Sequence, residues 1–392
     1  MDAVKRRHHA GRNLSQAVNI EDLRRMARRR LPNFSFEYVE GGAEDEISLK
    51  RNRDVFERIT WLPRTLASVG SPDLSTRIFG QTCHLPLVIA PTGFNGLLWP
   101  KGDLALAKAA AAAGVPFTLS TVSNYPLAGM MREVEGQVWF QLYPVKDETV
   151  VDQLIDRARE AGCQVMVVTT DVPVFGAREW DQRNYRAPMK LRAASVLDVL
   201  GHPRWLWQVM IPGGAPKFEN LVEFLPPGAH SAMVGARYMG TQINARLAWS
   251  DIERMRSRWP GKLVLKGVLC VEDARRAVES GADGIVLSNH GGRQLDSAVS
   301  GLELLPSIAS EVRDRITVLV DGGFRRGSDV LKAVALGAHG VMIGRAALYG
   351  LAAGGEAGAT CALGLLRAEM ERAMILLGCR TIGELGRHLI RT

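Results

Sequence analysis

The chain has 392 residues, of which 46% are hydrophobic and 23% charged, with 40 glycines; this is typical of a folded α/β protein and excludes a disordered or fibrous chain. The length exceeds that of most single domains, but α/β barrels commonly reach about 250 residues or more, so one large domain with insertions and two domains both fit. The formal net charge of +8 suits acidic small molecules, anionic membranes and nucleic acid alike.

The N-terminal segment is strongly basic: residues 1–30 contain nine lysines and arginines against three acids. We expect residues 1–18 to form a solvated, partly disordered arm, with attraction to anionic lipid as the alternative. No apolar run predicts a secretory signal or a membrane-spanning helix. The five cysteines form no CxxC pair and no metal-ligand spacing. They therefore favour a reducing, cytoplasmic compartment and no bound metal.

From residue 85 onward, short β-branched runs alternate with helical stretches, which predicts βα units and a parallel sheet. Helices are clearest over residues 101–113, 271–280 and 328–336. The eight predicted strands are 85–93, 115–123, 137–144, 164–173, 262–268, 284–292, 316–323 and 341–346. Together they predict an α/β fold, a (β/α)8 TIM barrel over residues 19–392 with an N-terminal helical extension.

A long insertion, about residues 176–250, follows the fourth predicted strand. Its place at a βα junction predicts a lid or binding loop over the C-terminal face of the barrel. The string HPRWLWQVMIP (202–212) mixes tryptophans and aliphatic residues with a base, and residues 176–220 carry seven basic against four acidic residues. This favours an interfacial membrane anchor around residues 190–215, with a plain lid that packs its tryptophans on the barrel as the alternative.

Polar residues end every predicted strand, where such barrels carry their chemistry. After the last two strands, DGGFRRGSD (321–329) and VMIGRA (341–346) place glycine N–H groups and arginines where a phosphate binds in this fold. A phosphorylated cofactor is therefore favoured, although glycines that serve tight turns and arginines that face solvent would also fit. No GxGxxG follows any strand, so a dinucleotide-binding fold has no support.

His290 ends the sixth strand, and Arg293 follows three residues later. An imidazole there can take a proton near neutral pH, a carboxylate such as Asp171 could orient it, and an arginine fork matches a substrate carboxylate. A purely structural histidine is the alternative. Base and anion clamp together describe a site for a small carboxylic acid. Lys266 stays open between a Schiff-base lysine, a surface residue and a fixed charge beside a cofactor.

Several strings together resemble the FMN-dependent L-2-hydroxy acid dehydrogenase/oxidase family, over residues 19–390. They are SNHGGRQLD (288–296), DGGFRRGSD (321–329), WFQLY (139–143), APTG (90–93), LKG (265–267) and YVEGGAEDE (38–46). Within the family, NRDVF (52–56), PTGFNGLLWPKGDLALAKAA (91–110) and HPRWLW (202–207) are most similar to the membrane-associated (S)-mandelate dehydrogenases.

The resemblance implies FMN as the cofactor and a role for each matching residue. His290 would remove a substrate proton with support from Asp171, and Lys266 would stabilise anionic reduced flavin. The substrate carboxylate and hydroxyl would be held by Tyr38, Tyr143, Arg178 and Arg293. The cofactor would contact Pro91, Thr92, Gly93, Ser120, Gln141, Tyr143, Thr169, Lys266, Ser288, Asp321, Gly322, Gly323, Arg325, Gly344 and Arg345.

Two positions depart from the family pattern. Gly93 stands where many relatives carry alanine, which we expect to leave extra room beside the flavin. That position bears on reactivity with oxygen, so a dehydrogenase is favoured over an oxidase. Tyr185, in QRNYRAP (182–188), replaces a usual arginine, so the family's lid contacts do not transfer.

These observations predict FMN-dependent oxidation of an (S)-2-hydroxy acid, mandelate or a substituted mandelate, to the 2-oxo acid. We expect electrons to pass to a quinone or other membrane acceptor, at the inner face of the cell membrane. The alternatives are an oxygen-using hydroxy acid oxidase, an L-lactate dehydrogenase and, more remotely, an FMN-dependent isopentenyl diphosphate isomerase. Only the net charge supports a role in nucleic-acid binding. The family also implies a homotetramer.

Overall fold

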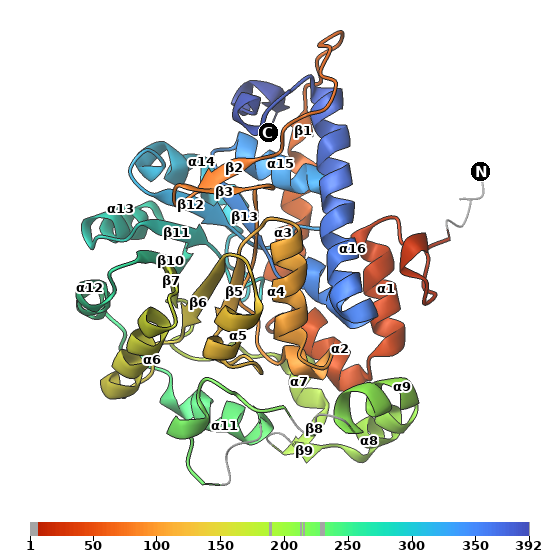
Figure 1. The fold of residues 1–392 in the computed structure, drawn as a ribbon, viewed down its shortest axis with the longest axis vertical. Helices are drawn as coiled ribbons and strands as arrows, with labels where there is room; N and C mark the ends of the chain where they lie inside the picture. Colours follow the sequence, from red (N-terminus) through yellow and green to blue (C-terminus); the bar gives the residue numbers. More distant parts are fainter. Residues whose placement is uncertain (1–6, 188–189, 212–213, 215, 228–231, 392) are drawn as a thin grey trace.

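A closed barrel of eight parallel strands forms the centre of the computed structural model, which describes residues 7–187, 190–211, 214, 216–227 and 232–391 (Figure 1). Its strands are β4 (Leu87–Ile89), β5 (Phe117–Ser120), β6 (Val138–Leu142), β7 (Val165–Thr169), β10 (Lys262–Val268), β11 (Gly284–Leu287), β12 (Thr317–Val320) and β13 (Gly340–Ile343). They follow chain order around the barrel, which closes where β13 pairs with β4. Every predicted run overlaps one of these strands, with β13 beginning one residue before its predicted run, so the predicted TIM barrel is confirmed.

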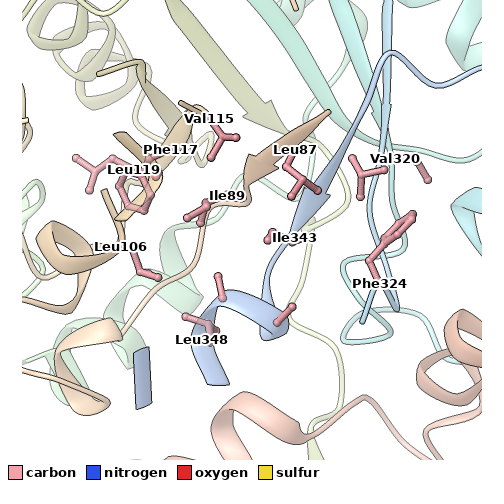
Figure 2. Close-up of a cluster of buried hydrophobic side chains, with 14 of the residues drawn as sticks. Leu87, Ile89, Leu106, Val115, Phe117, Leu119, Val320, Phe324, Ile343 and Leu348 are labelled. Carbon is pink, nitrogen blue, oxygen red and sulfur yellow. The ribbon is translucent and has the colours of Figure 1, made fainter. Parts of the chain in front are cut away.

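Alternate side chains of the strands fill two separate apolar layers, as the period of two in a strand requires. Val88 of β4 points into the barrel and packs in a buried interior cluster with Val264 and Leu319. Its neighbours Leu87 and Ile89 belong to the outer layer between the strands and the helices, where Figure 2 shows them near Ile343 and Leu348. Because both faces of each strand are buried, these strands read as nearly continuous apolar runs.

Helices cover the outside of the barrel. They are α4 (Gly102–Ala112), α5 (Leu127–Glu133), α6 (Glu148–Glu160), α12 (Trp249–Arg258), α13 (Val271–Glu279), α14 (Gly301–Val312), α15 (Gly327–Ala335) and α16 (Arg345–Leu377). The three helices predicted most clearly, α4, α13 and α15, are confirmed to within one residue at each end. Helix α4 is almost entirely alanine and leucine because it is covered by the barrel on one side and by α16 on the other.

The N-terminal extension contains the short η1 (Leu14–Gln16) and the helices α1 (Ile20–Arg30), α2 (Asn33–Glu40) and α3 (Ile47–Arg58). Part of the predicted basic arm is docked rather than solvated. The carboxylate of Asp22 accepts hydrogen bonds from the backbone of His9 and Val18, both at 3.0 Å, and Leu14 packs against Gly354 of α16. Residues 9–18 are therefore docked by one buried carboxylate and one leucine, while Arg12, Asn13, Ser15, Gln16 and Val18 stay exposed; residues 1–6 lie outside the described part.

A hairpin of β2 (Thr76–Ile78) and β3 (Gln81–Cys83) closes the N-terminal end of the barrel. Its two-residue turn, Phe79–Gly80, has positive φ at both positions, as such hairpins require. Ile78 and Cys83 are buried in the interior cluster. Nearby, β1 (Thr60–Trp61) pairs with the C-terminal β14 (Ile390–Arg391), which follows η5 (Ile382–Glu384) and η6 (Arg387–Leu389).

The insertion between β7 and β10 lies at the opposite, C-terminal end, with η2 (Asn95–Leu97) of the first strand loop. It contains α7 (Glu179–Arg183), β8 (Tyr185–Ala187), β9 (Lys190–Leu191), α8 (Ala193–Leu200), α9 (Pro203–Trp205), the π-helical η3 (Leu206–Met210), η4 (Val222–Phe224) and α11 (Ala232–Gln242), which gather at one end of the molecule (Figure 1). Within the described ranges, no helix is both long enough and apolar enough to cross a membrane.

Candidate active site

One cavity of about 690 Å³ lies at the C-terminal ends of the barrel strands, and the insertion forms part of its wall. Fifteen of the predicted site residues line it. They are Tyr38, Pro91, Thr92, Gly93, Tyr143, Arg178, Lys266, His290, Arg293, Asp321, Gly322, Gly323, Arg325, Gly344 and Arg345. Residues from the N-terminal extension, six barrel strands and the insertion thus meet in a single site.

Three further predicted residues, Ser120, Gln141 and Thr169, form a buried layer behind that wall. The side-chain oxygen of Gln141 accepts a hydrogen bond from Ser120 Oγ at 2.8 Å, and its amide nitrogen donates to Thr169 Oγ1 at 2.9 Å. This chain runs across the ends of β5, β6 and β7. Because every member is paired, the layer is rigid.

His290 and Asp171 form a hydrogen-bonded pair, with the imidazole Nδ1 at 3.0 Å from Asp171 Oδ1. Burial lowers the pKa of His290, and the opposing charge of Asp171 does not restore it. Burial by itself would raise the pKa of Asp171, but the charges of His290 and Lys266 outweigh it and lower that pKa. At neutral pH the pair is therefore a neutral imidazole held by a carboxylate, which leaves Nε2 free to take a proton.

The backbone around His290 is unusual. His290, Gly291 and Gly292 all have positive φ, at 57°, 66° and 75°. Such a turn is unfavourable for a histidine, and it persists only because its surroundings hold it. One of these contacts is the hydrogen bond that His290 N donates to Ser288 Oγ at 3.0 Å.

Lys266 is a buried, permanently charged group, with 4% of its surface exposed. Its ammonium donates to Ser288 Oγ at 2.8 Å and lies 3.1 Å from Asp321 Oδ2. Burial tends to lower the pKa of Lys266, but the carboxylates of Asp321 and Asp171 outweigh it and raise that pKa. Of the three alternatives left open by the sequence, the fixed positive charge is the one that fits, because a Schiff-base lysine must lose its proton.

Two arginines meet at the side of the cavity near Tyr38. Arg293 donates to the carbonyl oxygen of Gly41 at 2.7 Å, and its guanidinium lies 5.2 Å from the centre of the Tyr38 ring. The guanidinium of Arg178 makes two long hydrogen bonds of 3.4 Å, to the carbonyl oxygen of Arg293 and to Gln294 Oε1, and lies 5.7 Å from the centre of the Phe175 ring. Burial, with the neighbouring charge of Arg293, lowers the pKa of Arg178 to about 10. The Arg178 guanidinium therefore remains charged at neutral pH, and the cost of burying it would fall when an anion binds between the two arginines.

Two tyrosine hydroxyls face the same space as neutral donors. Tyr38 Oη donates to the carbonyl of Gly93 at 3.4 Å, and burial raises its pKa. Burial, and then the charge of Asp171, raise the pKa of Tyr143 to about 12. Both phenols therefore keep their protons at neutral pH.

The end of the cavity near β12 and β13 is suited to a phosphate. Gly322 and Gly323 have φ values of 101° and 83°, conformations that expose backbone N–H groups, and Arg325 lines the cavity beside them. The guanidinium of Arg345 is already used, because it donates to the carbonyls of Val39, Gly41 and Gly291 at 2.8–2.9 Å. Arg345 thus also holds the wall together, and Arg325, whose Nη1 donates to the carbonyl oxygen of Phe324 at 2.8 Å, lines the same end of the cavity.

These residues fit FMN, the cofactor implied by the resemblance. The Oδ1 atom of Asp321 is buried without a hydrogen-bond partner in the cavity wall, so it can accept from a ligand hydroxyl. The fixed charge of Lys266 stands beside it and suits an electron-rich ring, while Arg325 and the glycines suit a phosphate. A flat ring, a hydroxylated chain and an anionic end therefore each find matching groups.

Some residues of the cavity wall were not predicted from the sequence. Its apolar part contains Phe34, Phe94, Phe175, Phe218 and Met239, three of them from the insertion and its approach. Asp181 also lines the cavity, and its Oδ1 is buried without a partner. The only sequence feature that pointed to Asp181 was its position three residues after Arg178. Tyr185, noted as a departure from the family, faces the same cavity.

The expectation that Gly93 leaves extra room is wrong. A Cβ atom at Gly93 would lie 2.8 Å from Val122 Cγ2 and 3.6 Å from Tyr38 Oη. The space that a methyl group would take is therefore already filled by Val122, and an alanine requires that this valine move.

Comparison with known proteins agrees with this site. The family model described as FMN-dependent dehydrogenase matches residues 27–392. The chain is 45% identical to (S)-mandelate dehydrogenase of Pseudomonas putida, over 94% of this chain and 92% of that protein. It is 44% identical to a putative L-lactate dehydrogenase of Mycobacterium tuberculosis, over 96% and 90%. A crystal structure described as monotopic membrane protein (S)-mandelate dehydrogenase superposes with a TM-score of 0.91 at 44% identity, covering 95% of this chain and 99% of that one. With the family model matched along nearly the whole chain, this protein belongs to the FMN-dependent dehydrogenases that oxidise 2-hydroxy acids.

Proposed function

We propose that this member of the family oxidises an (S)-2-hydroxy acid with an aromatic side chain, mandelate or a ring-substituted mandelate, to the 2-oxo acid. The observation that carries the proposal is the neutral, buried His290–Asp171 pair beside two arginines, in a cavity whose other wall is aromatic. The reaction removes two electrons and two protons from the substrate, one proton from the hydroxyl and one hydrogen from Cα. When bound, FMN supplies the two-electron acceptor.

His290 takes a substrate proton on Nε2. Its lowered pKa keeps the imidazole neutral and ready to accept, and Asp171 stabilises the imidazolium that results. Lys266 is a buried positive charge in the cavity wall and would stabilise the negative charge of a reduced cofactor.

Arg178 and Arg293 bind the substrate carboxylate, because a planar guanidinium matches a carboxylate in two parallel hydrogen bonds. Tyr38 and Tyr143 donate hydrogen bonds to the carboxylate and hydroxyl. Together these four side chains orient Cα toward His290. Orientation of this kind is a large part of catalysis when a small, flexible acid must react in one geometry.

FMN itself is held by groups already described. The glycines of the β12 turn, Gly344 and Arg325 would hold its phosphate, Asp321 would accept from its hydroxyl groups, and the loop with Pro91, Thr92 and Gly93 would contact the rest of the cofactor. The buried layer of Ser120, Gln141, Thr169 and Ser288 holds that wall in place.

The aromatic substrate is favoured by the apolar wall. The two relatives do not separate mandelate from lactate, since the identities of 45% and 44% are nearly equal. Five large apolar side chains around the cavity give a phenyl ring something to pack against, which a methyl group would leave largely unfilled. An L-lactate dehydrogenase is the second candidate, and the relatives support it.

We also propose that the insertion rests on a membrane. Val196, Leu197, Leu200, Trp207 and Ile211, which we call the apolar patch, lie within the predicted 190–215 anchor and are between 47% and 70% exposed. Arg204 stands among them on the same segment. Apolar and aromatic side chains with basic neighbours suit the interface of an anionic bilayer. Residues 212, 213 and 215 of the predicted anchor lie outside the described part of the chain.

Membrane contact agrees with a quinone or another membrane carrier as the final electron acceptor, on the cytoplasmic side of the cell membrane. The structural relative described as monotopic supports the membrane contact. We also propose that the protein forms the homotetramer that the family implies. Light scattering in detergent measures the number of subunits.

The proposed reaction is tested by the visible absorbance of the purified protein without air, before and after (S)-mandelate, with L-lactate in a parallel sample. Rapid bleaching by mandelate and slow bleaching by lactate is expected. Faster bleaching by lactate would overturn the aromatic preference, and a yellow protein bleached by neither acid would overturn the proposed substrates. Peroxide formation in air at the rate of turnover would replace the membrane acceptor with oxygen.

A further inference from the structure

The string NRDVF (52–56) lies on α3, behind the cavity and not in its wall. Its first residue, Asn52, is only 1% exposed although it is polar. It stands between two turns of the barrel, one that follows β11 and carries His290 and one that follows β12 and carries Gly322 and Gly323. Its contacts with each turn are specific.

Toward the first turn, Asn52 and Asn289 exchange two amide hydrogen bonds. Asn52 Nδ2 donates to Asn289 Oδ1 at 2.8 Å, and Asn289 Nδ2 donates to Asn52 Oδ1 at 3.0 Å. Asn289 directly precedes His290, and its Oδ1 also accepts from Gly292 N at 3.0 Å. The side chain of Asn289 therefore spans the left-handed turn, and Asn52 fixes how that side chain is oriented.

A second anchor joins the same loop to α3. The carboxylate of Asp296 accepts from Ser48 N at 2.7 Å and from Ile47 N at 3.1 Å, and so caps the N-terminus of the helix. The segment 289–296 is thus attached to α3 at both ends, with His290 between the attachments.

Toward the second turn, the backbone of α3 packs directly against the glycine backbone. A Cβ atom on Gly323 would lie 1.8 Å from the carbonyl oxygen of Asn52, and one on Gly322 would lie 3.2 Å from its side-chain Cγ. Arg53 donates to the carbonyl of Gly323 and lies 3.0 Å from Asp329. Phe56 packs edge-on against Phe324, with 5.0 Å between the centres of the two rings. The turn proposed to hold the cofactor phosphate is therefore seated on the residues of NRDVF.

We propose that Asn52 is a positioning residue that couples these two turns, so that the turn that holds phosphate and the turn that places His290 keep one fixed geometry. The roles of the turns rest on the proposed function, whereas the contacts do not. A rigid bridge of this kind serves a base that must stay within a fraction of an ångström of its working position. Asn52 touches neither substrate nor cofactor and acts through Asn289 and Gly323.

The test replaces Asn52 in the FMN-loaded enzyme. Asn52→Leu keeps the volume and removes both amide bonds, while Asn52→Asp keeps the acceptor for Asn289 and loses the donor. Glu57→Ala, an exposed position on the same helix, is the matched control. Three quantities are measured: the rate at which fluorescent free FMN appears on dilution, hydrogen exchange in peptides covering 288–292 and 321–326, and the rate constant of anaerobic flavin reduction with FMN in excess.

For Asn52→Leu we expect FMN release and exchange in both turns to rise about ten-fold, and the reduction rate constant to fall about ten-fold. Asn52→Asp should lie between this variant and the control. A response in only one turn, or uniform exchange across the whole barrel with a normal reduction rate, would overturn the coupling. If Asn52→Leu does not fold, Asn52→Asp and Asn52→Ser carry the same measurements. If no 2-hydroxy acid reduces the wild-type flavin, the proposed substrates fail, while FMN release and exchange still decide the role of Asn52.

Discussion

The C-terminal end of the barrel and the insertion differ in which side chains they bury and which they expose. At the barrel end the polar groups are buried and paired, as in the chain from Ser120 through Gln141 to Thr169. In the insertion, large apolar groups are left uncovered. Within the insertion itself, Trp205 is 1% exposed, with its indole N–H donating to the carbonyl of Leu97, whereas Trp207 is 70% exposed. One segment therefore packs against the cavity-lining residues Phe34 and Leu97 and also presents the apolar patch.

This difference suggests that chemistry and membrane contact are separable. Variants of the buried barrel end should change flavin reduction and leave membrane binding intact, while variants of the apolar patch should do the reverse. Each prediction below either breaks that separation or sharpens it.

The largest effect is expected for Asp171→Asn. The amide cannot stabilise a charged imidazolium, so the rate constant of flavin reduction should fall by about 10²–10⁴-fold. Asp171 opposes the lowering of the His290 pKa, so its loss should also move the acid limb of the pH profile to lower pH. Stopped-flow reduction across pH measures both effects. An unchanged rate would show that Asp171 has no catalytic part.

Arg178→Met should weaken substrate binding by about 2–5 kcal/mol, because a buried charged partner of the carboxylate is lost. The dissociation constant of (S)-mandelate, taken from the concentration dependence of flavin reduction, measures this. Vesicle binding should not change. Equal affinity in variant and wild type would contradict the anion clamp.

Trp207→Ser should reduce binding to vesicles of anionic phospholipid by about ten-fold, since burying one large apolar side chain contributes about 1.5–3 kcal/mol. Leu376→Ser is the matched control, because Leu376 is 64% exposed near the C-terminal end of α16, and that end of the helix lies away from α8 (Figure 1). Flotation measures binding and stopped-flow measures reduction. Equal loss in both variants, or a slower reduction in Trp207→Ser, would break the separation.

The smallest effect is expected for Asp181→Asn. Burial raises the pKa of Asp181, and the neighbouring Arg293 and Arg178 oppose that rise. Removing a negative charge beside the arginine pair should tighten the binding of a monocarboxylate several-fold, by about 1 kcal/mol. Competition by an unreactive aromatic carboxylate measures this change. Weaker binding would show that Asp181 contacts the ligand as an acceptor.

The barrel and most of the site were predictable because their signals are local. A strand, its polar end and the turn that follows are read within about ten residues, and residues such as His290 and Lys266 stand at those ends. What joins these ends is not local. Asn52 and Asn289 are 237 residues apart, and no sequence pattern around either residue predicts that they form a hydrogen-bonded pair.

The aromatic wall and the docked arm were missed for a related reason. Phe218 and Met239 come from an insertion with no repeating pattern, so their direction is set only when the insertion folds onto the barrel. The arm looked solvated because its sequence is basic, but the bonds to Asp22 and the packing of Leu14 are tertiary contacts. The commitment of Arg345 to three carbonyls is likewise visible only in three dimensions.

The measurement that tests the central claim most directly is anaerobic flavin reduction by (S)-mandelate in the wild type and in His290→Gln, over a range of pH. In the wild type, the rate should fall only as the pH drops through a value below about 6.5, because burial lowers the pKa of His290 and the neutral form is the base. The variant should keep FMN and lose about 10²–10⁴-fold in rate, together with this acid limb. Reduction of the variant at the wild-type rate would contradict His290 as the base.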